Sequence, residues 1–257
     1  MNVRKTILAV MVCCYLILWV GGVASHFLFG RTPADALWAA TAFLSLAGLL
    51  VLLTANRTNR MTLLVVGVIG FAAEAIGVHS GFPFGRYEYT AVLQPQLIGV
   101  PVVMAAAWMV LVAYIKTMLA SFRLSLWLEA LIASAWMVAI DLVIDPLAAG
   151  ELNYWRWLDS GSYYGIPLQN FVGWFAVSFV IFALLKLNRN AAWQSNAWTV
   201  SIGLSIVLFF TFIALVHHLM LIAAIGFGLC LFHLAMAYLH KTTTTRQINQ
   251  PQATGDL

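Results

Sequence analysis

Apolar residues recur along almost the whole chain in runs of 18 or more, separated by short polar segments. Such runs are typical of helices that cross a bilayer, because about 20 helical residues span a hydrocarbon core about 30 Å thick. The pattern therefore predicts an all-α fold, a polytopic membrane helical bundle of about eight transmembrane helices. The expected spans are 6–24, 36–54, 61–79, 97–116, 124–144, 168–186, 196–216 and 219–239.

The last two spans form one apolar stretch that only His217 and His218 interrupt. A single helix of that length would be too long for one crossing, so we expect a tight turn at these histidines. Residues 1–240 are then expected to form a single transmembrane domain. The polar segment 241–257, with its run of threonines, is expected to be a disordered cytoplasmic tail.

The basic residues indicate how the bundle is oriented. With eight crossings, ten of the 13 lysines and arginines fall on the side that holds both chain ends. Short loops rich in Lys and Arg stay in the cytoplasm, so we expect a multi-pass protein of the cell membrane with cytoplasmic N- and C-termini. The long loops 80–96 and 145–167, rich in aromatic residues, Gly and Pro, then face outward.

The composition excludes several classes of protein function. Hydrophobic residues make up 63% of the chain and charged residues 9%, whereas about a quarter of a soluble domain is charged. The basic residues lie at helix ends and form no cluster suited to a nucleic-acid backbone, so membrane lipids are the expected surroundings. The three cysteines lie in apolar runs, and the sequence has no metal-binding histidine cluster and no phosphate-binding loop. We therefore expect neither a metal nor a cofactor.

Two segments 66 residues apart share a pattern. Gly99-Val-Pro101 is followed by Trp108, and Gly165-Ile-Pro167 is followed by Trp174 at the same spacing. A tyrosine-rich loop precedes each, and proline is favoured just inside a helix start. The pattern predicts an internal repeat of two helix hairpins whose loops meet over a shared cavity. The alternative is chance, because Gly-x-Pro at helix starts and Trp near membrane interfaces are common.

Three acids, Glu74, Asp141 and Asp145, lie within or at the outer ends of apolar helices. Ionisable groups are unfavourable there and usually face a cavity or a partner. Asp141 and Asp145 share a helix face, and Pro146 is expected to end that helix. Two neighbouring carboxyl groups in apolar surroundings favour one staying protonated near neutral pH, ready to donate a proton.

A structural role for these acids is the alternative. Asp141 or Glu74 could bond to Asn170, Arg86 or a tyrosine and only hold helices together. Glu129, near the opposite end of its helix, is interpreted as structural: it either meets the cytoplasmic interface or pairs with Arg123.

Aromatic residues gather at the level of the three acids. Some belong to an interfacial belt, but aromatic faces also stabilise cations, so an acid beside an aromatic pocket suits protonation of an alkene. The candidate catalytic residues are Asp141, Asp145 and Glu74. The candidate substrate-binding residues are Phe84, Tyr87, Tyr89, Trp108, Trp155, Tyr163, Tyr164, Asn170 and Trp174.

Two long motifs, in this order, resemble the membrane carotenoid hydratases, the group of bisanhydrobacterioruberin hydratase and monocyclic-carotene hydratase. The first comprises Glu74-Ala-Ile-Gly77, Gly81-Phe-Pro-Phe-Gly-Arg-Tyr-Glu-Tyr89 and Gly99-Val-Pro101. The second comprises Asp141-Leu-Val-Ile-Asp-Pro146, Trp155-Arg-Trp157, Gly161-Ser-Tyr-Tyr-Gly-Ile-Pro-Leu-Gln-Asn170 and Gly173-Trp174. The resemblance covers residues 74–174.

The resemblance implies a hydro-lyase that adds water across the terminal C=C of an acyclic (ψ) carotenoid end and gives a tertiary alcohol. The substrate would lie in the bilayer, neighbouring carotenoid enzymes are expected partners, and no cofactor is needed. By this chemistry, Asp141 or Asp145 would donate the proton, while Glu74 would position or deprotonate water. Tyr87, Tyr164 and Trp174 would line the cation site.

Other functions fit the same residues. A carotenoid or isoprenoid lyase or isomerase could work through the same cation, and a non-enzymatic carotenoid or lipid binder could use the same pocket. A transporter fits less well, because its polar groups would lie near the membrane midplane. The sequence does not distinguish C40 from C50 substrates, or hydration of one end from hydration of both.

Overall fold

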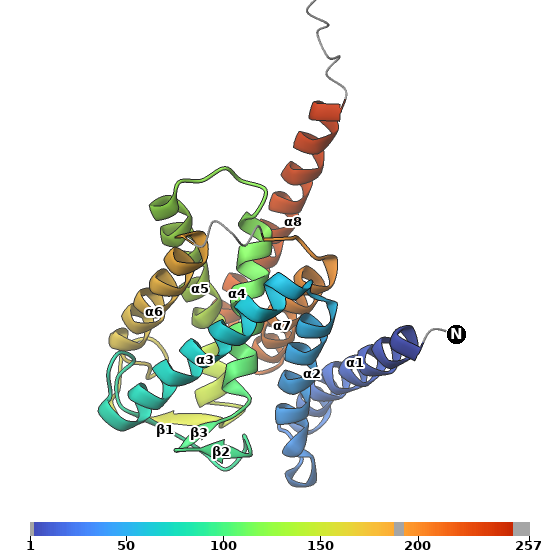
Figure 1. Cartoon of the computed structure of the whole chain (residues 1–257). Helices are drawn as coiled ribbons and strands as arrows, with labels where there is room; N and C mark the ends of the chain where they lie inside the picture. The colour runs from blue at the N-terminus through green and yellow to red at the C-terminus, as the bar shows by residue number, and fades with distance from the viewer. Residues whose placement is uncertain (1–2, 188–192, 249–257) are drawn as a thin grey trace, which may run out of the picture.

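The computed structural model describes residues 3–187 and 193–248 (Figure 1). Within these ranges, seven helices are long and apolar enough to cross a membrane, and α4 is a shorter apolar helix. The predicted polytopic helical bundle is therefore confirmed. The helices are α1 (Val3–Phe29), η1 (Ala34–Ala36), α2 (Trp38–Thr54), α3 (Arg57–Ser80), α4 (Met104–Leu119), α5 (Leu126–Ala149), α6 (Leu168–Leu187), α7 (Ala197–Val216) and α8 (Met220–Ile248).

Two small sheets cover one face of the bundle, which we call the sheet face (Figure 1). β1 (Tyr87–Tyr89) pairs antiparallel with β4 (Trp155–Trp157), and Glu88 lies opposite Arg156 in the middle of the register. β2 (Gln96–Leu97) pairs with β3 (Val100–Pro101) in the α3–α4 connection. The β1–β4 ladder therefore joins the two long loops.

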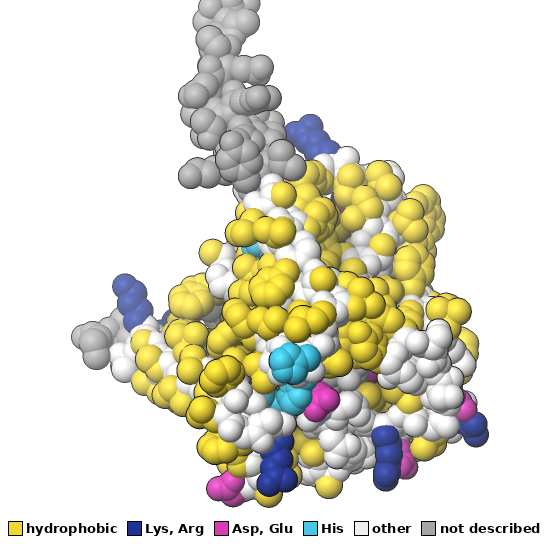
Figure 2. Space-filling model, turned by 180° about the vertical axis from the view of Figure 1, so that it is seen from behind, with side chains coloured by type: hydrophobic (Ala, Val, Ile, Leu, Met, Phe, Trp, Pro, Cys, Tyr) yellow, Lys and Arg dark blue, Asp and Glu magenta, His cyan; other side chains and the backbone are white. Residues whose placement is uncertain are grey.

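The core is built around α4, which contacts α2, α3, α5 and α7 and is buried along most of its length. Glycines allow the closest approaches: the ring of Trp108 packs over Gly70 of α3, and that of Tyr114 packs over Gly203 of α7. α1 lies at the edge of the bundle against α2 and α7 (Figure 1). Hydrophobic side chains cover much of the surface seen in Figure 2, as expected where lipid surrounds a protein.

The two predicted hairpins share the same backbone conformation at their turns. Ile98 and Gly99 have φ values of 49° and 76°, and Tyr164 and Gly165 have φ values of 50° and 82°. Each pair forms a two-residue turn between bridged residues, as two positive φ angles allow. The same turn is thus found twice, 66 residues apart, and α3 packs on α4 as α5 packs on α6.

The start predicted for the fourth span, residue 97, is wrong. Residues 96–101 form the β2–β3 hairpin, and α4 begins at Met104. The positive φ angles at Ile98 and Gly99 are incompatible with a helix, and Pro101 lies in β3 rather than in the first helical turn. Pro167, in contrast, directly precedes α6.

The prediction that Pro146 ends its helix is also wrong, because α5 continues to Ala149. Proline has no N–H, so it cannot bond to the carbonyl of Leu142 one turn earlier. The hydroxyl of Tyr163 donates to that carbonyl instead, at 2.9 Å. A side chain from the following loop therefore replaces the missing backbone hydrogen bond.

The predicted turn at His217 and His218 is confirmed, since α7 ends at Val216 and α8 begins at Met220. α8 is helical as far as Ile248, past residue 241, where the disordered tail was predicted to begin. Extending an existing helix is far easier than nucleating one, which accounts for the later boundary. Residues 249–257 of the predicted tail lie outside the described residues.

Candidate active site

The carboxylate of Glu74 is buried near the sheet-face end of α3 and accepts three hydrogen bonds. The hydroxyls of Tyr87 and Tyr89 donate to Oε2 at 2.5 and 2.9 Å. Trp108 Nε1 donates to Oε1 at 3.0 Å. Two donors therefore come from strand β1 and the third from α4, the helix that follows.

Asp145 of α5 is bonded in the same way by the second hairpin. Nε1 of Trp155 and Nε1 of Trp157, both on β4, donate to Oδ1 at 2.7 and 3.3 Å. Asn170 of α6 donates to Oδ2 at 2.7 Å. Glu74 and Asp145 are thus matched carboxylates, each held by two aromatic donors from a strand and one donor from a helix.

The alternation of strand side chains explains this arrangement. Successive residues point to opposite faces, so Tyr87 and Tyr89 reach inward to Glu74 while Glu88 between them points outward. Glu88 pairs there with Arg156 at 2.5 Å. Burial, reinforced by the charge of Glu74, raises the pKa of both Tyr87 and Tyr89, so both phenols remain hydrogen-bond donors.

Asp141 differs from the other two acids. It lies one helical turn from Asp145 and is buried, but only Asn170 donates to it, at 2.8 Å to Oδ2. Among the described residues, none donates a hydrogen bond to its Oδ1. Asn170 therefore bridges two carboxyl groups through one amide nitrogen and leaves one oxygen of Asp141 available for other chemistry.

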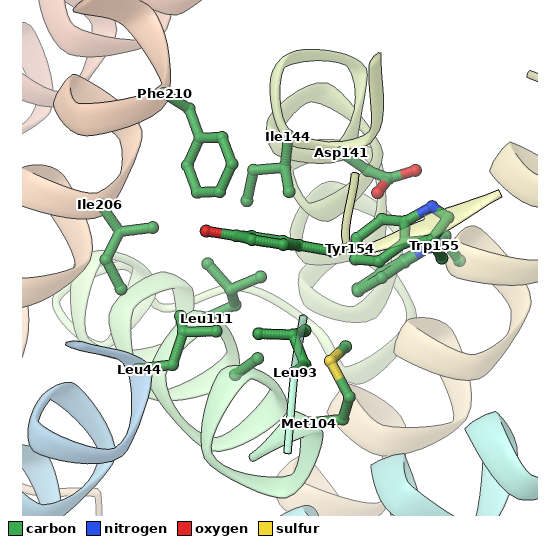
Figure 3. A pocket seen from close by; sticks show the side chains of 12 residues that line it. Leu44, Leu93, Met104, Leu111, Asp141, Ile144, Tyr154, Trp155, Ile206 and Phe210 are labelled. Atoms are coloured by element: carbon green, nitrogen blue, oxygen red, sulfur yellow. The ribbon is translucent and has the colours of Figure 1, made fainter. Parts of the chain in front are cut away.

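A pocket with a cavity volume of about 50 Å³ opens beside Asp141 (Figure 3). Its lining is apolar with few polar groups, as is usual for small-molecule sites. Asp141 is the one charged residue among those that line it. The other lining residues are Leu44, Leu93, Met104, Ala107, Leu111, Ile144, Tyr154, Trp155, Trp174, Ile206 and Phe210.

A second, smaller pocket lies between Glu74 and Asp145 and has space for about one water molecule. The phenols of Tyr87 and Tyr89 and the amide of Asn170 also line it. Three further residues, Met104, Trp155 and Trp174, line both pockets. An apolar pocket with one acid and a polar pocket with two carboxylates therefore share a wall.

The structure brings most of the predicted site residues together. Phe84, Tyr87, Tyr89 and Asn170 line the smaller pocket, and Trp155 and Trp174 line both pockets. Trp108 lies behind them, fully buried against Glu74 and Trp174. Tyr163 and Tyr164 line neither pocket: Tyr163 caps Leu142, and Tyr164 is 46% exposed in its turn.

Of the alternative partners expected for Asp141 and Glu74, Asn170 and the tyrosines are found and Arg86 is not. Arg86 bonds to none of the three acids and pairs with Asp159 at 2.5 Å, on the exposed side of the loops. Glu129 is paired with Lys116 and Lys186, so the alternative of a pair with Arg123 is wrong. Both lysines lie on neighbouring helices. A partner chosen because it is close in sequence would therefore be neither of them.

Sequence reasoning missed several lining residues. Trp157 could have been included, because it lies two positions after Trp155 and so on the same face of the strand. Tyr154 has an inward-facing ring that no local pattern indicates. Leu44 of α2 and the α7 residues Ile206 and Phe210 lie in helices that are apolar on every side, so periodicity does not separate pocket-facing from lipid-facing positions.

The arrangement suits proton transfer to an apolar molecule. An acidic residue is part of the lining of an apolar, aromatic-lined pocket, and two carboxylates with room for water lie next to that pocket. Within the described ranges, no group of three or more His, Cys, Asp or Glu residues is arranged to hold a metal ion.

Comparison with known proteins identifies the family of the chain. No curated protein and no solved structure matches it. The family described as "Carotenoid biosynthesis protein" matches residues 35–235, a range that contains the three acids and both pockets. Because the match covers well over half of the sequence, the chain belongs to the carotenoid biosynthesis protein family.

Proposed function

We propose that the protein is a carotenoid hydratase that adds water to the terminal C=C of an acyclic carotenoid end. The observation that carries this proposal is the different bonding of the three acids. Glu74 and Asp145 each accept three hydrogen bonds, which favour the ionised carboxylate, whereas Asp141 accepts one and faces the apolar pocket. Asp141 is therefore assigned as the proton donor.

The reaction begins with the alkene end in the larger pocket. The carboxyl group of Asp141 donates its proton to the less substituted alkene carbon, and the π electrons form the new C–H bond. A tertiary carbocation remains on the other carbon, beside the faces of Trp155 and Trp174. Aromatic faces stabilise such a cation, and the apolar lining keeps bulk water away from it.

Water then captures the cation. A molecule in the smaller pocket forms a C–O bond with the cationic carbon and loses a proton to Asp145 or Glu74. The product is a tertiary alcohol, and the sum is the addition of one H₂O. Transfer of a proton back to Asp141 completes the cycle, and its shared contact with Asn170 keeps the two aspartates close enough for exchange through one water.

The position of the site supports this assignment. A long polyene that lies across the bilayer has its ends near the two membrane surfaces, where water is available. The acids lie near the sheet face of the bundle, and the charge distribution favours an outward orientation for that face. The second candidate, a lyase or isomerase that uses the same cation, would not need space for water beside two carboxylates.

A pigment analysis tests the proposal. The chain is expressed in a bacterial host that accumulates acyclic and monocyclic carotenoids, and the extract is separated by chromatography with mass detection. We expect a new pigment heavier by one water, which the Asp141→Asn variant does not form although it reaches the membrane in equal amount. Asp159→Asn, an exposed acid paired with Arg86, is the matched control and should form the pigment normally.

Two other outcomes would redirect the assignment. A fully active Asp141→Asn variant together with an inactive Asp145→Asn variant would move the proton donor to Asp145. If no heavier pigment formed with either C40 or C50 substrates while the protein was present in the membrane, the hydratase proposal would fail and a binding role would replace it.

A further inference from the structure

We infer that the enzyme hydrates one end of a polyene per binding event, so that a substrate with two reactive ends must leave and rebind inverted before it reacts again. The inference rests on the proposed function and adds to it how a symmetric substrate is used. Three observations carry it: the difference between the two hairpins, the charges near the opposite face, and the length of the bundle.

The two hairpins carry matched carboxylates, but only one has an additional acid. Asp141 precedes Asp145 by four residues, and the residue four before Glu74 is Gly70. A Cβ atom at Gly70 would overlap the ring of Trp108, so no side chain fits at this position. In the first hairpin, the indole of Trp108 occupies this space. At the corresponding place in the second hairpin lies Asp141, the proposed proton donor.

The face opposite the sheets offers no second proton donor. Glu129 is the one acid described in that half of the bundle, and both of its oxygens are bonded to lysines, Oε1 to Lys116 and Oε2 to Lys186. Because both oxygens are bonded to ammonium groups, neither oxygen of Glu129 is available to an alkene. The acidic chemistry of the described residues is therefore confined to the sheet-face half.

Length keeps the second end away from Asp141. Asp141 and Glu129 are 12 residues apart on α5, which corresponds to about 18 Å along the helix axis. The two ends of a C40 polyene are separated by roughly the thickness of the bilayer core, about 30 Å. When one end occupies the pocket beside Asp141, the other end lies toward the opposite membrane surface, where the one acid among the described residues is Glu129 with its two lysine partners.

A trapping experiment tests the inference. The purified protein in liposomes receives lycopene, an acyclic carotenoid with two equivalent ends, and the singly and doubly hydrated pigments are followed over time. We expect only the singly hydrated pigment in the first turnovers, accumulating before the doubly hydrated one appears. A large excess of a monocyclic carotenoid with one reactive end, added at that point, should stop further conversion because it competes for the emptied site.

A second measurement compares the initial rates for a substrate with two reactive ends and a substrate with one. Because two equivalent ends have the same activation barrier, lycopene should react at an initial rate about twice that of the monocyclic substrate under subsaturating conditions. Asp159→Asn serves again as the control and should form the hydrated pigments at an unaltered rate.

Each outcome is decisive. Doubly hydrated pigment formed in a constant ratio from the first turnovers, and unaffected by the trap, would overturn the inference while leaving the hydratase function intact. Singly hydrated pigment that never reacts further, even without the competing carotenoid, would overturn the rebinding step of the inference. The absence of any hydrated pigment, from lycopene and from the monocyclic carotenoid alike, would remove the proposed function and this inference together.

Discussion

The indole rings of Trp108 and Trp174 stack face to face, with centroids 4.4 Å apart and planes inclined by 11°. They occupy equivalent positions in the two hairpins, 66 residues apart, so the halves of the site meet at this pair. Their other contacts differ. Trp108 donates to Glu74, whereas Trp174 lines both pockets.

Trp108→Phe should separate the stacking role of this residue from its hydrogen bond. Phenylalanine keeps an aromatic face for Trp174 but removes the donor to Glu74, and a hydrogen bond to a charged group contributes about 1.5–3 kcal/mol. We expect roughly a tenfold loss of hydrated pigment per folded protein. Trp127→Phe, a 65% exposed tryptophan, is the control and should retain activity. Equal activity in both variants would exclude a functional role for the Glu74 contact.

Tyr163→Phe should destabilise the fold through the carbonyl of Leu142. Pro146 leaves that carbonyl without its helical partner, and the variant removes the hydroxyl that replaces it. We expect a loss of about 0.5–2 kcal/mol, seen as a lower melting temperature in detergent. The neighbouring Tyr164→Phe provides the control, because that side chain is 46% exposed. Identical melting of the two variants would show that water satisfies the carbonyl equally well.

Gly70→Ala should be poorly tolerated, although alanine favours helices. The added Cβ would overlap Trp108, and overpacking of this kind costs about 1–3 kcal/mol. Gly228→Ala is the matched control on α8, where a Cβ meets nothing within 4 Å and should be neutral or stabilising. Thermal unfolding of both variants checks the prediction, and a stable Gly70→Ala protein would show that the indole can move aside.

Acid should weaken the sheet face through Asp159. The hydrogen bond from the Arg86 side chain, together with the Arg86 charge, holds the pKa of Asp159 below its ordinary range. Its contribution to stability is therefore present above the unfolded pKa of about 3.9 and is lost as the pH falls through the lower folded value. Asp159→Asn should flatten the acid side of the stability profile. Because the pair is exposed, high salt should reduce the difference between the two proteins; a difference that salt leaves unchanged would assign the effect to another group.

Much of this architecture follows from sequence pattern. The long apolar runs predict the spans, and the length limit on a membrane helix predicts the turn at His217. The acids could be identified because ionisable groups in apolar helices need a local reason. Asn170 was expected as a possible partner of Asp141, and that contact is found. The contacts of Trp108 with Glu74 and of Asn170 with Asp145 could not be identified, because they join elements that are distant in sequence.

The errors have a common physical cause. Pro146 was expected to end its helix because local rules do not include a donor from another segment, which Tyr163 supplies. Tyr164 was assigned to the cation site with its neighbours, whereas its positive φ angle places it in a two-residue turn, where it is 46% exposed and lines neither pocket. In both cases the outcome depends on the loop conformation after α5, which the pattern of apolar residues does not encode.

In the proposed reaction, the three-residue strands β1 and β4 lie on the route by which water would reach the smaller pocket. Glu88 and Arg156 lie on the exposed side of this two-stranded ladder, while Tyr87 and Trp155 lie on the side of the carboxylates. This two-stranded ladder therefore separates the exposed surface from the pocket that would hold the reacting water. In the proposed reaction, each turnover would be resupplied with water across these two strands, at a rate that should be independent of how far the polyene extends into the membrane.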